Sequence, residues 1–135
     1  MTPRLTFEVP GPVYGKGRPR FVRSTGRAYT PADTVTAESW VRTCALNAGA
    51  TPLEGPLSLT VHVRVQIPQS WSQKKRSEAL GSPTTGKPDL DNIVKLIGDS
   101  LNGIAWADDR QVAALWTTRR YAETPGATII IEGMT

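Results

Sequence analysis

The chain has 135 residues, of which 39% are hydrophobic and 21% are charged, and these values fit one compact globular domain with a buried core. Its apolar runs span only a few residues, which excludes a transmembrane helix, and the first residues lack the cationic start and apolar core of a signal peptide. The single cysteine, Cys44, excludes an internal disulfide, and the formal net charge of +4 suggests an anionic partner, so we expect a cytoplasmic protein with no membrane contact.

The amino-terminal part predicts a strand followed by a basic loop and a small hairpin. Residues 5–9 alternate apolar and polar side chains and end at a Pro-Gly-Pro turn, which is typical of a strand. A glycine-broken loop over 15–21 leads to a short strand at 21–22, which a turn at 24–26 pairs with 28–29. The cations of this region have no acid beside them in the sequence and are predicted to bind nucleic-acid phosphates: Lys16, Arg18, Arg20, Arg23 and Arg27.

The middle of the chain predicts a helix, a strand and a second, shorter helix. Thr30 and Pro31 are typical of a helix start, and the helix is expected to run to a glycine stop at Gly49. Residues 57–67 alternate strictly between apolar and polar side chains, which predicts a strand with one buried face. Residues 71–80 predict a short basic helix, whose cations form a second group of phosphate-binding candidates: Lys74, Lys75 and Arg76.

The last third predicts a helix over 90–101 and two strands over 112–121 and 127–132, joined through Pro125-Gly126. The helix is amphipathic, since its apolar side chains share one arc of the helical projection. The whole pattern predicts an α/β (α+β) fold in a single small domain over residues 1–135, with a mixed β-sheet and helices packed on one face.

Charge is unevenly distributed along the sequence. Residues 89–109 contain five acids and one base, net −4, whereas the rest of the chain carries a net charge of +8. Asp91, Lys95 and Asp99 follow each other at intervals of four residues and so form one ridge on the polar face of the helix. Asp89 could simply cap this helix and Asp91 could pair with Lys95, which is a structural interpretation of the same residues.

Two further carboxylates, Asp108 and Asp109, precede the next strand and are not explained by helix capping. If that strand packs beside the helix, they could return towards the helix start. Converging carboxylates repel one another unless a cation is present, and hard divalent ions prefer oxygen ligands. Since the chain has one histidine and one cysteine, structural zinc is not expected. The pattern therefore indicates a divalent metal held by carboxylates.

The segment 86–103, GKPDLDNIVKLIGDSLNG, followed by 104–112, IAWADDRQV, resembles the signature of the RusA-type Holliday junction resolvases. The resemblance implies that Asp89, Asp91 and Asp109 are the catalytic, metal-binding carboxylates, with Asp108 as a neighbouring candidate. It implies that Lys95 is the essential lysine. Lys87 stands where some members carry a run of arginines, and is a candidate DNA contact. The resemblance further implies Mg²⁺ dependence, a homodimer and symmetrical nicking of four-way junctions.

From these patterns we predict a Mg²⁺-dependent, structure-selective DNA endonuclease that resolves branched DNA in recombination and repair, with Mn²⁺ as a substitute ion. Its expected setting is the cytoplasm of a bacterium or of a phage-infected host. Two alternatives stay open at this point. One is a non-catalytic basic DNA-binding module, and the other is a metal-dependent nuclease that acts on RNA or on flaps.

Overall fold

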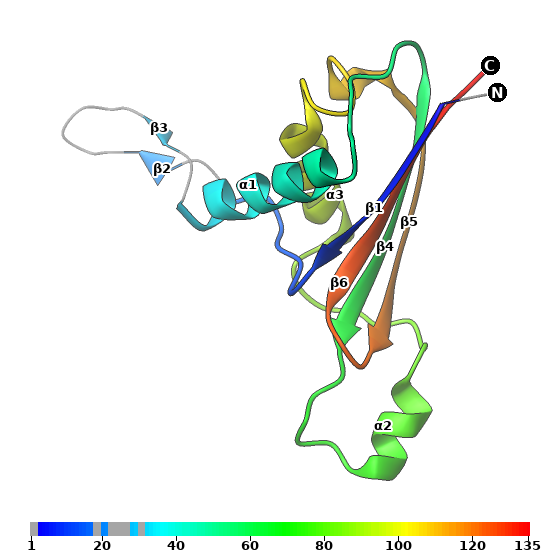
Figure 1. Cartoon of the computed structure of the whole chain (residues 1–135). Coiled ribbons are helices and arrows are strands. Elements are labelled where there is room, and N and C mark those ends of the chain that lie inside the picture. Colours follow the sequence, from blue (N-terminus) through cyan, green and yellow to red (C-terminus); the bar gives the residue numbers. More distant parts are fainter. Residues whose placement is uncertain (1–2, 18–19, 22–27, 30–31) are drawn as a thin grey trace.

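The computed structural model describes residues 3–17, 20–21, 28–29 and 32–135, and for residues 20–21, 28–29 and 32 it describes the backbone only (Figure 1). The expectations for Arg18, Arg23, Arg27, the turn at 24–26 and the helix start at Thr30 and Pro31 lie outside the described residues. The elements are β1 (Arg4–Pro10), β2 (Arg20–Phe21), β3 (Ala28–Tyr29), α1 (Ala32–Asn47), β4 (Leu57–Gln66), α2 (Gln73–Ala79), α3 (Leu90–Leu101), a 3-10 turn η1 (Asp109–Gln111), β5 (Val112–Ala122) and β6 (Gly126–Gly133).

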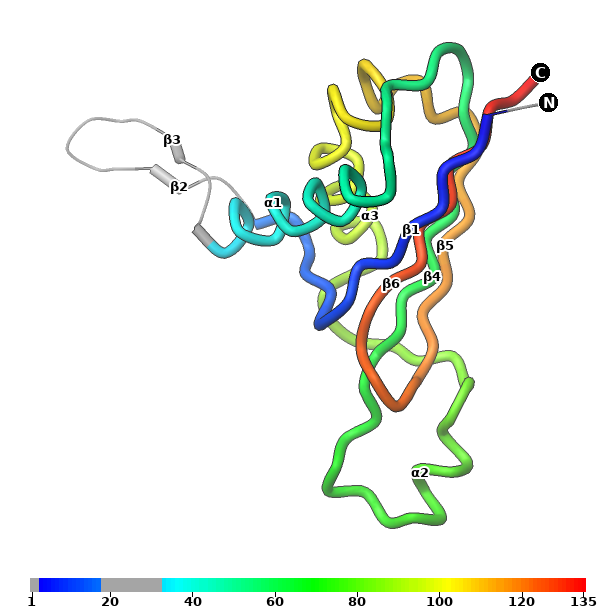
Figure 2. The backbone as a smooth tube through the Cα atoms, in the orientation of Figure 1, coloured from blue at the N-terminus to red at the C-terminus, as the bar shows by residue number. Residues whose placement is uncertain are grey.

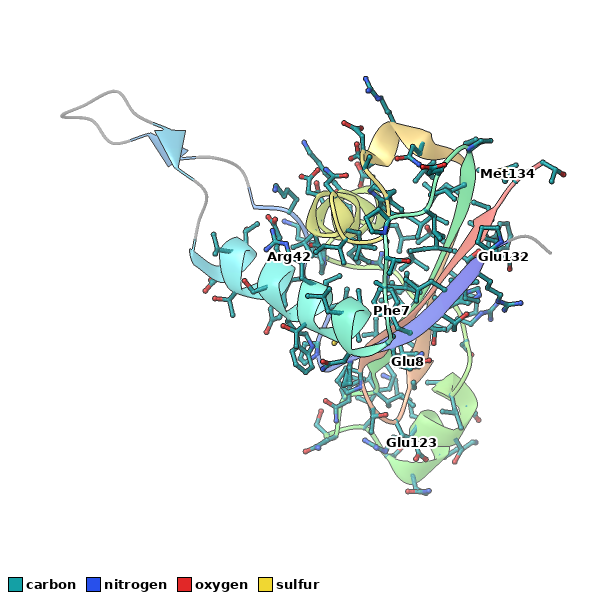
Figure 3. The ribbon with its side chains drawn as sticks, turned by 45° about the horizontal axis from the view of Figure 1, so that its top comes forward. Phe7, Glu8, Arg42, Glu123, Glu132 and Met134 are labelled. Atoms are coloured by element: carbon teal, nitrogen blue, oxygen red, sulfur yellow. The ribbon has the colours of Figure 1, made fainter. Side chains whose placement is uncertain are left out.

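A four-stranded mixed sheet in the order β1-β6-β4-β5 organises the molecule. β6 is antiparallel to both β1 and β4, whereas β5 runs parallel to β4 and forms one edge. Helices α1 and α3 lie side by side on one face of the sheet, and α2 lies beyond one end of it (Figures 1 and 3). The start of β1 and the end of β6 lie side by side, as Figure 2 shows. The predicted α+β fold, a mixed sheet with helices on one face, is confirmed.

The core lies between the sheet and the two helices, and the period of each element explains it. Along β4, Leu57, Leu59, Val61 and Val63 are buried, while the residues between them face the open side of the sheet. Helix α3 has the predicted bounds and buries its apolar side chains against the strands, with Trp106 fully buried beside it. The apolar face of α3 therefore fixes the position of the helix, and its polar face is left available to contact a ligand.

Several elements differ from the expectation for physical reasons. The last two strands are not neighbours, because β6 inserts between β1 and β4. Helix α2 begins after Ser72, whose side chain accepts a hydrogen bond from the Lys75 amide and so caps it. From the sequence we expect the large apolar side chains of Trp40 and Trp116 in the core, but 45% and 64% of their surfaces are exposed. No helix in the described part of the chain is both long and apolar enough to span a membrane.

Candidate functional site

The start of α3 presents two exposed carboxylates. Asp89 occupies the N-cap position, and its carbonyl accepts a hydrogen bond from the Ile93 amide at 3.1 Å. Its carboxylate, however, makes no capping hydrogen bond. Asp91 follows in the first turn and is also exposed. Capping therefore does not account for the Asp89 side chain, which is left available for a ligand.

Lys95 lies one turn after Asp91 and its side chain is exposed. Among the described residues, neither Lys95 nor Asp91 takes part in an ion pair. The structural interpretation of these two residues as a helix ion pair is thus not what the structure contains. The Lys95 ammonium is free to face an anion that approaches the polar face of α3.

Asp108 has a structural task at the start of η1. Its carboxylate accepts a hydrogen bond from the Arg110 amide at 2.9 Å, and Gln111 closes the capping box by accepting from the Asp108 amide. The Arg110 amide, rather than any cation, is the main cause that holds the pKa of Asp108 below its usual value. Gln111 also donates to the carbonyls of Leu53 and Gly55, which ties η1 to the preceding loop.

Asp109 faces α3. A methyl group added to Gly98 would lie 3.5 Å from its Oδ2 and 3.7 Å from its Cβ, so the absence of a side chain at Gly98 leaves the space that Asp109 borders. The pKa of Asp109 is raised, and the largest cause is partial burial of its carboxyl. The hydrogen bond with Asp108, the charge of Asp108 and the charge of Asp99 follow in that order. Asp109 is a carboxylate in an unfavourable, acidic environment, which a bound cation would relieve.

The carboxylates do not all meet within one copy of the chain. Asp109 borders the later half of α3, and Gly98 is seven residues from Asp91, or about 10 Å along the helix axis. In the part of the chain that the structure describes, no three His, Cys, Asp or Glu side chains are grouped closely enough to hold a metal ion. Asp109 thus returns to α3 as expected, but it lies beside the later turns of the helix rather than beside its start.

The predicted phosphate-binding cations lie in different surroundings. Lys74 and Lys75 are exposed on α2, where the Lys75 ammonium stands 4.0 Å from the centre of the Trp71 ring. Arg76 donates to the Pro68 carbonyl at 3.0 Å. Lys87 is exposed and borders a cavity of about 260 Å³ beside the start of α3. For Arg20 only the backbone is described.

Lys16 differs from these cations: the local sequence has no acid beside it, but the fold places two acids next to its ammonium. Its ammonium lies 2.8 Å from Glu38 and 2.9 Å from Asp99. Lys16 therefore joins the amino-terminal loop to both α1 and α3.

Two further residues hold parts of the site together through contacts between distant segments. Arg119 donates to the carbonyls of Pro88 and Thr84 and so holds the segment that enters α3. Glu38 is mostly buried on α1, and its carboxylate forms ion pairs with both Lys16 and Arg42. Arg42 is labelled in Figure 3. The contacts of Glu38 with Lys16 and of Arg119 with Thr84 and Pro88 join residues more than 20 positions apart, so no local pattern predicts them. The Glu38–Arg42 pair, in contrast, is local, since its partners are four positions apart on α1.

Comparison with known proteins decides the family. Residues 10–132 match the family described as Endodeoxyribonuclease RusA. The chain belongs to the RusA family. A similar protein is the uncharacterized protein YqaN of Bacillus subtilis (strain 168), which is 33% identical over 135 residues and covers 94% of both chains. The RusA match includes the whole segment from Asp89 to Asp109.

RusA-family membership makes the protein an endodeoxyribonuclease, a hydrolase that cleaves phosphodiester bonds, of the Holliday junction resolvase type, which binds branched DNA. RusA resolvases are generally dependent on a divalent metal. The residue types present here suit such an ion, since Asp89 and Asp91 are exposed acids at the start of α3 and Asp109 stands beside Asp108, but no three of these acids, all of them described residues, meet within one copy. Oxygen donors of this kind suit hard divalent cations.

Proposed function

We propose that this RusA-family protein is a Mg²⁺-dependent resolvase that cuts four-way DNA junctions by paired nicks in recombination and repair, with Asp89, Asp91 and Asp109 as its metal-binding carboxylates. The main support is that the segment resembling the family's motif contains an N-cap acid that makes no capping hydrogen bond and a second carboxylate in an acidic environment. Asp89 stands at the N-cap position without a side-chain capping hydrogen bond, and Asp109 has Asp108, Asp99 and Gly98 beside it. Asp108 is a secondary candidate, since one of its oxygens is already engaged at η1.

A bound divalent ion would supply Lewis-acid chemistry at the scissile phosphate, by neutralising charge on the phosphoryl oxygens and lowering the pKa of an attacking water. The chain's own residues supply binding and orientation. Asp89 and Asp91 present their carboxylates from the rigid first turn of α3. The Lys95 ammonium, one turn along the same polar face, is placed to stabilise negative charge on the phosphate or the leaving oxygen. Mn²⁺ is expected to replace Mg²⁺ because it accepts the same oxygen ligands.

We also propose that the protein acts as a homodimer whose two copies meet along β5. The outer edge of β5 is covered in its second half, where Thr84 donates to the Arg119 carbonyl and Gly81 to the Tyr121 carbonyl. Its first half carries two large apolar side chains, Leu115 and Trp116, with 52% and 64% of their surfaces exposed. An open edge strand with exposed apolar side chains favours pairing with a second copy.

Dimer formation bears on the metal site, because one copy keeps Asp91 about 10 Å along α3 from the position of Asp109. Pairing along β5, the strand that directly follows Asp109, would place a second α3 near this carboxylate. We propose that each metal site uses acids of both copies. Mixing Asp91→Asn with Asp109→Asn subunits tests this: a shared site predicts that the mixture recovers cleavage that neither variant has alone. Failure to recover cleavage, with mixed dimers shown to form, would exclude it.

Cleavage of a synthetic four-way junction tests the function itself. The substrates are the junction, a linear duplex of the same sequence, a flap and a single-stranded RNA, each with Mg²⁺ or with a chelator. The proposal predicts Mg²⁺-dependent cutting of the junction in opposite strands and little cutting of the others. Asp91→Asn should bind the junction and leave it intact, while Asp33→Asn, the same change at an exposed acid of α1, should cut normally.

The alternatives give different outcomes in the same experiment. A non-catalytic DNA-binding module would leave every substrate intact with either protein. A nuclease for RNA or flaps would cut those substrates in preference to the junction. Tight junction binding without any metal-dependent product would therefore contradict the proposal.

A further inference from the structure

The segment 12–17 packs against the start of α3. A methyl group at Gly15 would lie 2.7 Å from the Pro88 Cβ and 3.1 Å from the Asn92 Cβ, so the backbone approaches the helix as closely as a glycine permits. The Lys16 amide donates to the Asn92 carbonyl at 3.0 Å, and the Gly17 amide donates to the Thr34 hydroxyl on α1 at 3.0 Å. Figure 2 shows this segment turning back from the end of β1 towards the start of α1.

The side chain of Lys16 adds a link between the same helices. Its ammonium lies 2.8 Å from Glu38 on α1 and 2.9 Å from Asp99 on α3. The side chains are largely shielded from water, with 21% of Lys16, 11% of Glu38 and 31% of Asp99 exposed. Removing one partner of a shielded, hydrogen-bonded ion pair destabilises the protein, because the other charge is left without a partner.

Asp99 stands next to the proposed site. It follows Gly98, which borders Asp109, and its charge is one of the causes that raise the pKa of Asp109, after partial burial and Asp108. It also lies on the same ridge of α3 as Asp91 and Lys95. Lys16 thus holds α3 at two places: its ammonium contacts Asp99 beside the position of Asp109, and its amide contacts Asn92, the residue after Asp91.

The same contacts make Lys16 a poor phosphate ligand. An ammonium group has three hydrogen atoms to donate, and two of them point to carboxylates. A phosphate that approached Lys16 would meet two negative charges within 3 Å of the ammonium, which would repel it. The sequence alone groups Lys16 with the phosphate-binding cations, but its surroundings separate it from them.

We propose that Lys16 is a positioning residue of the nuclease site: it fixes α3 against α1 through Asp99 and Glu38, and it does not bind DNA. This inference rests on the function proposed above. It predicts that loss of Lys16 lowers the rate of cleavage but not the electrostatic part of DNA binding.

The experiment compares Lys16→Met and Lys16→Arg with Lys74→Met, a matched change at an exposed cation of α2. Junction affinity is measured at several salt concentrations, and cleavage is measured in single turnover at saturating protein with Mg²⁺. For Lys16→Met we expect an unchanged salt slope and a cleavage rate lowered by about tenfold to a hundredfold, because small displacements of catalytic groups have such effects. Lys16→Arg should recover most of the rate. Lys74→Met should lower the salt slope by about 0.9, as expected for one lost phosphate contact.

Amide hydrogen exchange of residues 89–99 supplies a readout that does not depend on cleavage. Exchange there should be faster in Lys16→Met than in the unchanged protein, since α3 loses a tether. If Lys16→Met does not fold, Asp99→Asn removes the Lys16–Asp99 ion pair, which links the loop to α3, while leaving the Lys16–Glu38 pair. It should also lower the rate at an unchanged salt slope.

A Lys16→Met protein with a salt slope lowered by about 0.9 and a normal saturated rate would show that Lys16 binds phosphate, and would overturn the inference. So would normal cleavage and normal exchange in both Lys16→Met and Asp99→Asn. An unchanged protein that never cuts the junction would instead contradict the proposed function, and the exchange measurement would still report on the tether.

Discussion

Gly15 provides a test of how closely the start of α3 must be held. Replacement by alanine would put a methyl carbon 2.7 Å from the Pro88 Cβ and 3.1 Å from the Asn92 Cβ. Carbon atoms in contact normally lie about 3.5–4.0 Å apart, so the loop and the helix start would have to separate by about 1 Å. Neither neighbouring atom can rotate away, because one belongs to a proline ring and the other is attached directly to the backbone.

The expected cost follows from this overlap. Overpacking of this kind typically destabilises a protein by about 1–3 kcal/mol. For a domain of this size that corresponds to a melting temperature lower by roughly 3–12 °C. The parts that separate include the residues just before Asp89 and just after Asp91, so we also expect cleavage to fall by about a hundredfold.

Thermal unfolding and single-turnover cleavage of a four-way junction measure the two effects. Gly133→Ala is a matched control, because a methyl group there would lie 2.8 Å from the ring of Pro3, near the chain ends rather than α3. It should lower the melting temperature without a loss of cleavage at temperatures where it is folded. A Gly15→Ala protein that melts and cuts like the unchanged protein would refute the reasoning, as would an equal loss of cleavage in Gly133→Ala.

Three further substitutions test separate parts of the site. Lys95→Ala should lower cleavage by about a hundredfold and leave the melting temperature unchanged, because Lys95 is exposed; normal cleavage would remove its assignment. Asp109→Asn should raise the melting temperature in metal-free buffer, because the fold raises the pKa of the Asp109 carboxyl and so disfavours its charged form. The same substitution should abolish the stabilisation that Mg²⁺ gives the unchanged protein. Leu115→Ser combined with Trp116→Ser should convert dimers to monomers in sedimentation experiments, and persistent dimers would place the interface elsewhere.

The sequence was sufficient to predict the elements of the fold because their patterns are local. The alternation along 57–67 and the apolar arc of 90–101 each depend on a single periodicity, and both elements formed where expected. The order of strands was not accessible in the same way. Whether β6 pairs with β5 or inserts beside β4 depends on contacts between distant segments, which no local pattern encodes.

The candidate site shows the same contrast between features that a local pattern reveals and features that depend on distant segments. The acids of α3 and the carboxylates before β5 could be named from the sequence, because the family motif and the residue types mark them. The surroundings of each side chain could not. Lys16 is part of a basic run in the sequence, but the fold brings Glu38 and Asp99 to it from distant positions. The capping box of Asp108 and Gln111 is different, because its spacing of three residues is a local signal that could have been recognised in the sequence. Exposure of Trp116 likewise depends on β5 being an edge strand.

A crystal structure of the protein grown with Mn²⁺ tests the central claim most directly. The account predicts anomalous density for Mn²⁺ within about 2.0–2.5 Å of carboxylate oxygens from Asp89 and Asp91 of one copy and from Asp109 of a second copy. Mn²⁺ bound only at other residues, under conditions in which the junction is cut, would contradict the assignment of these three acids as the metal site.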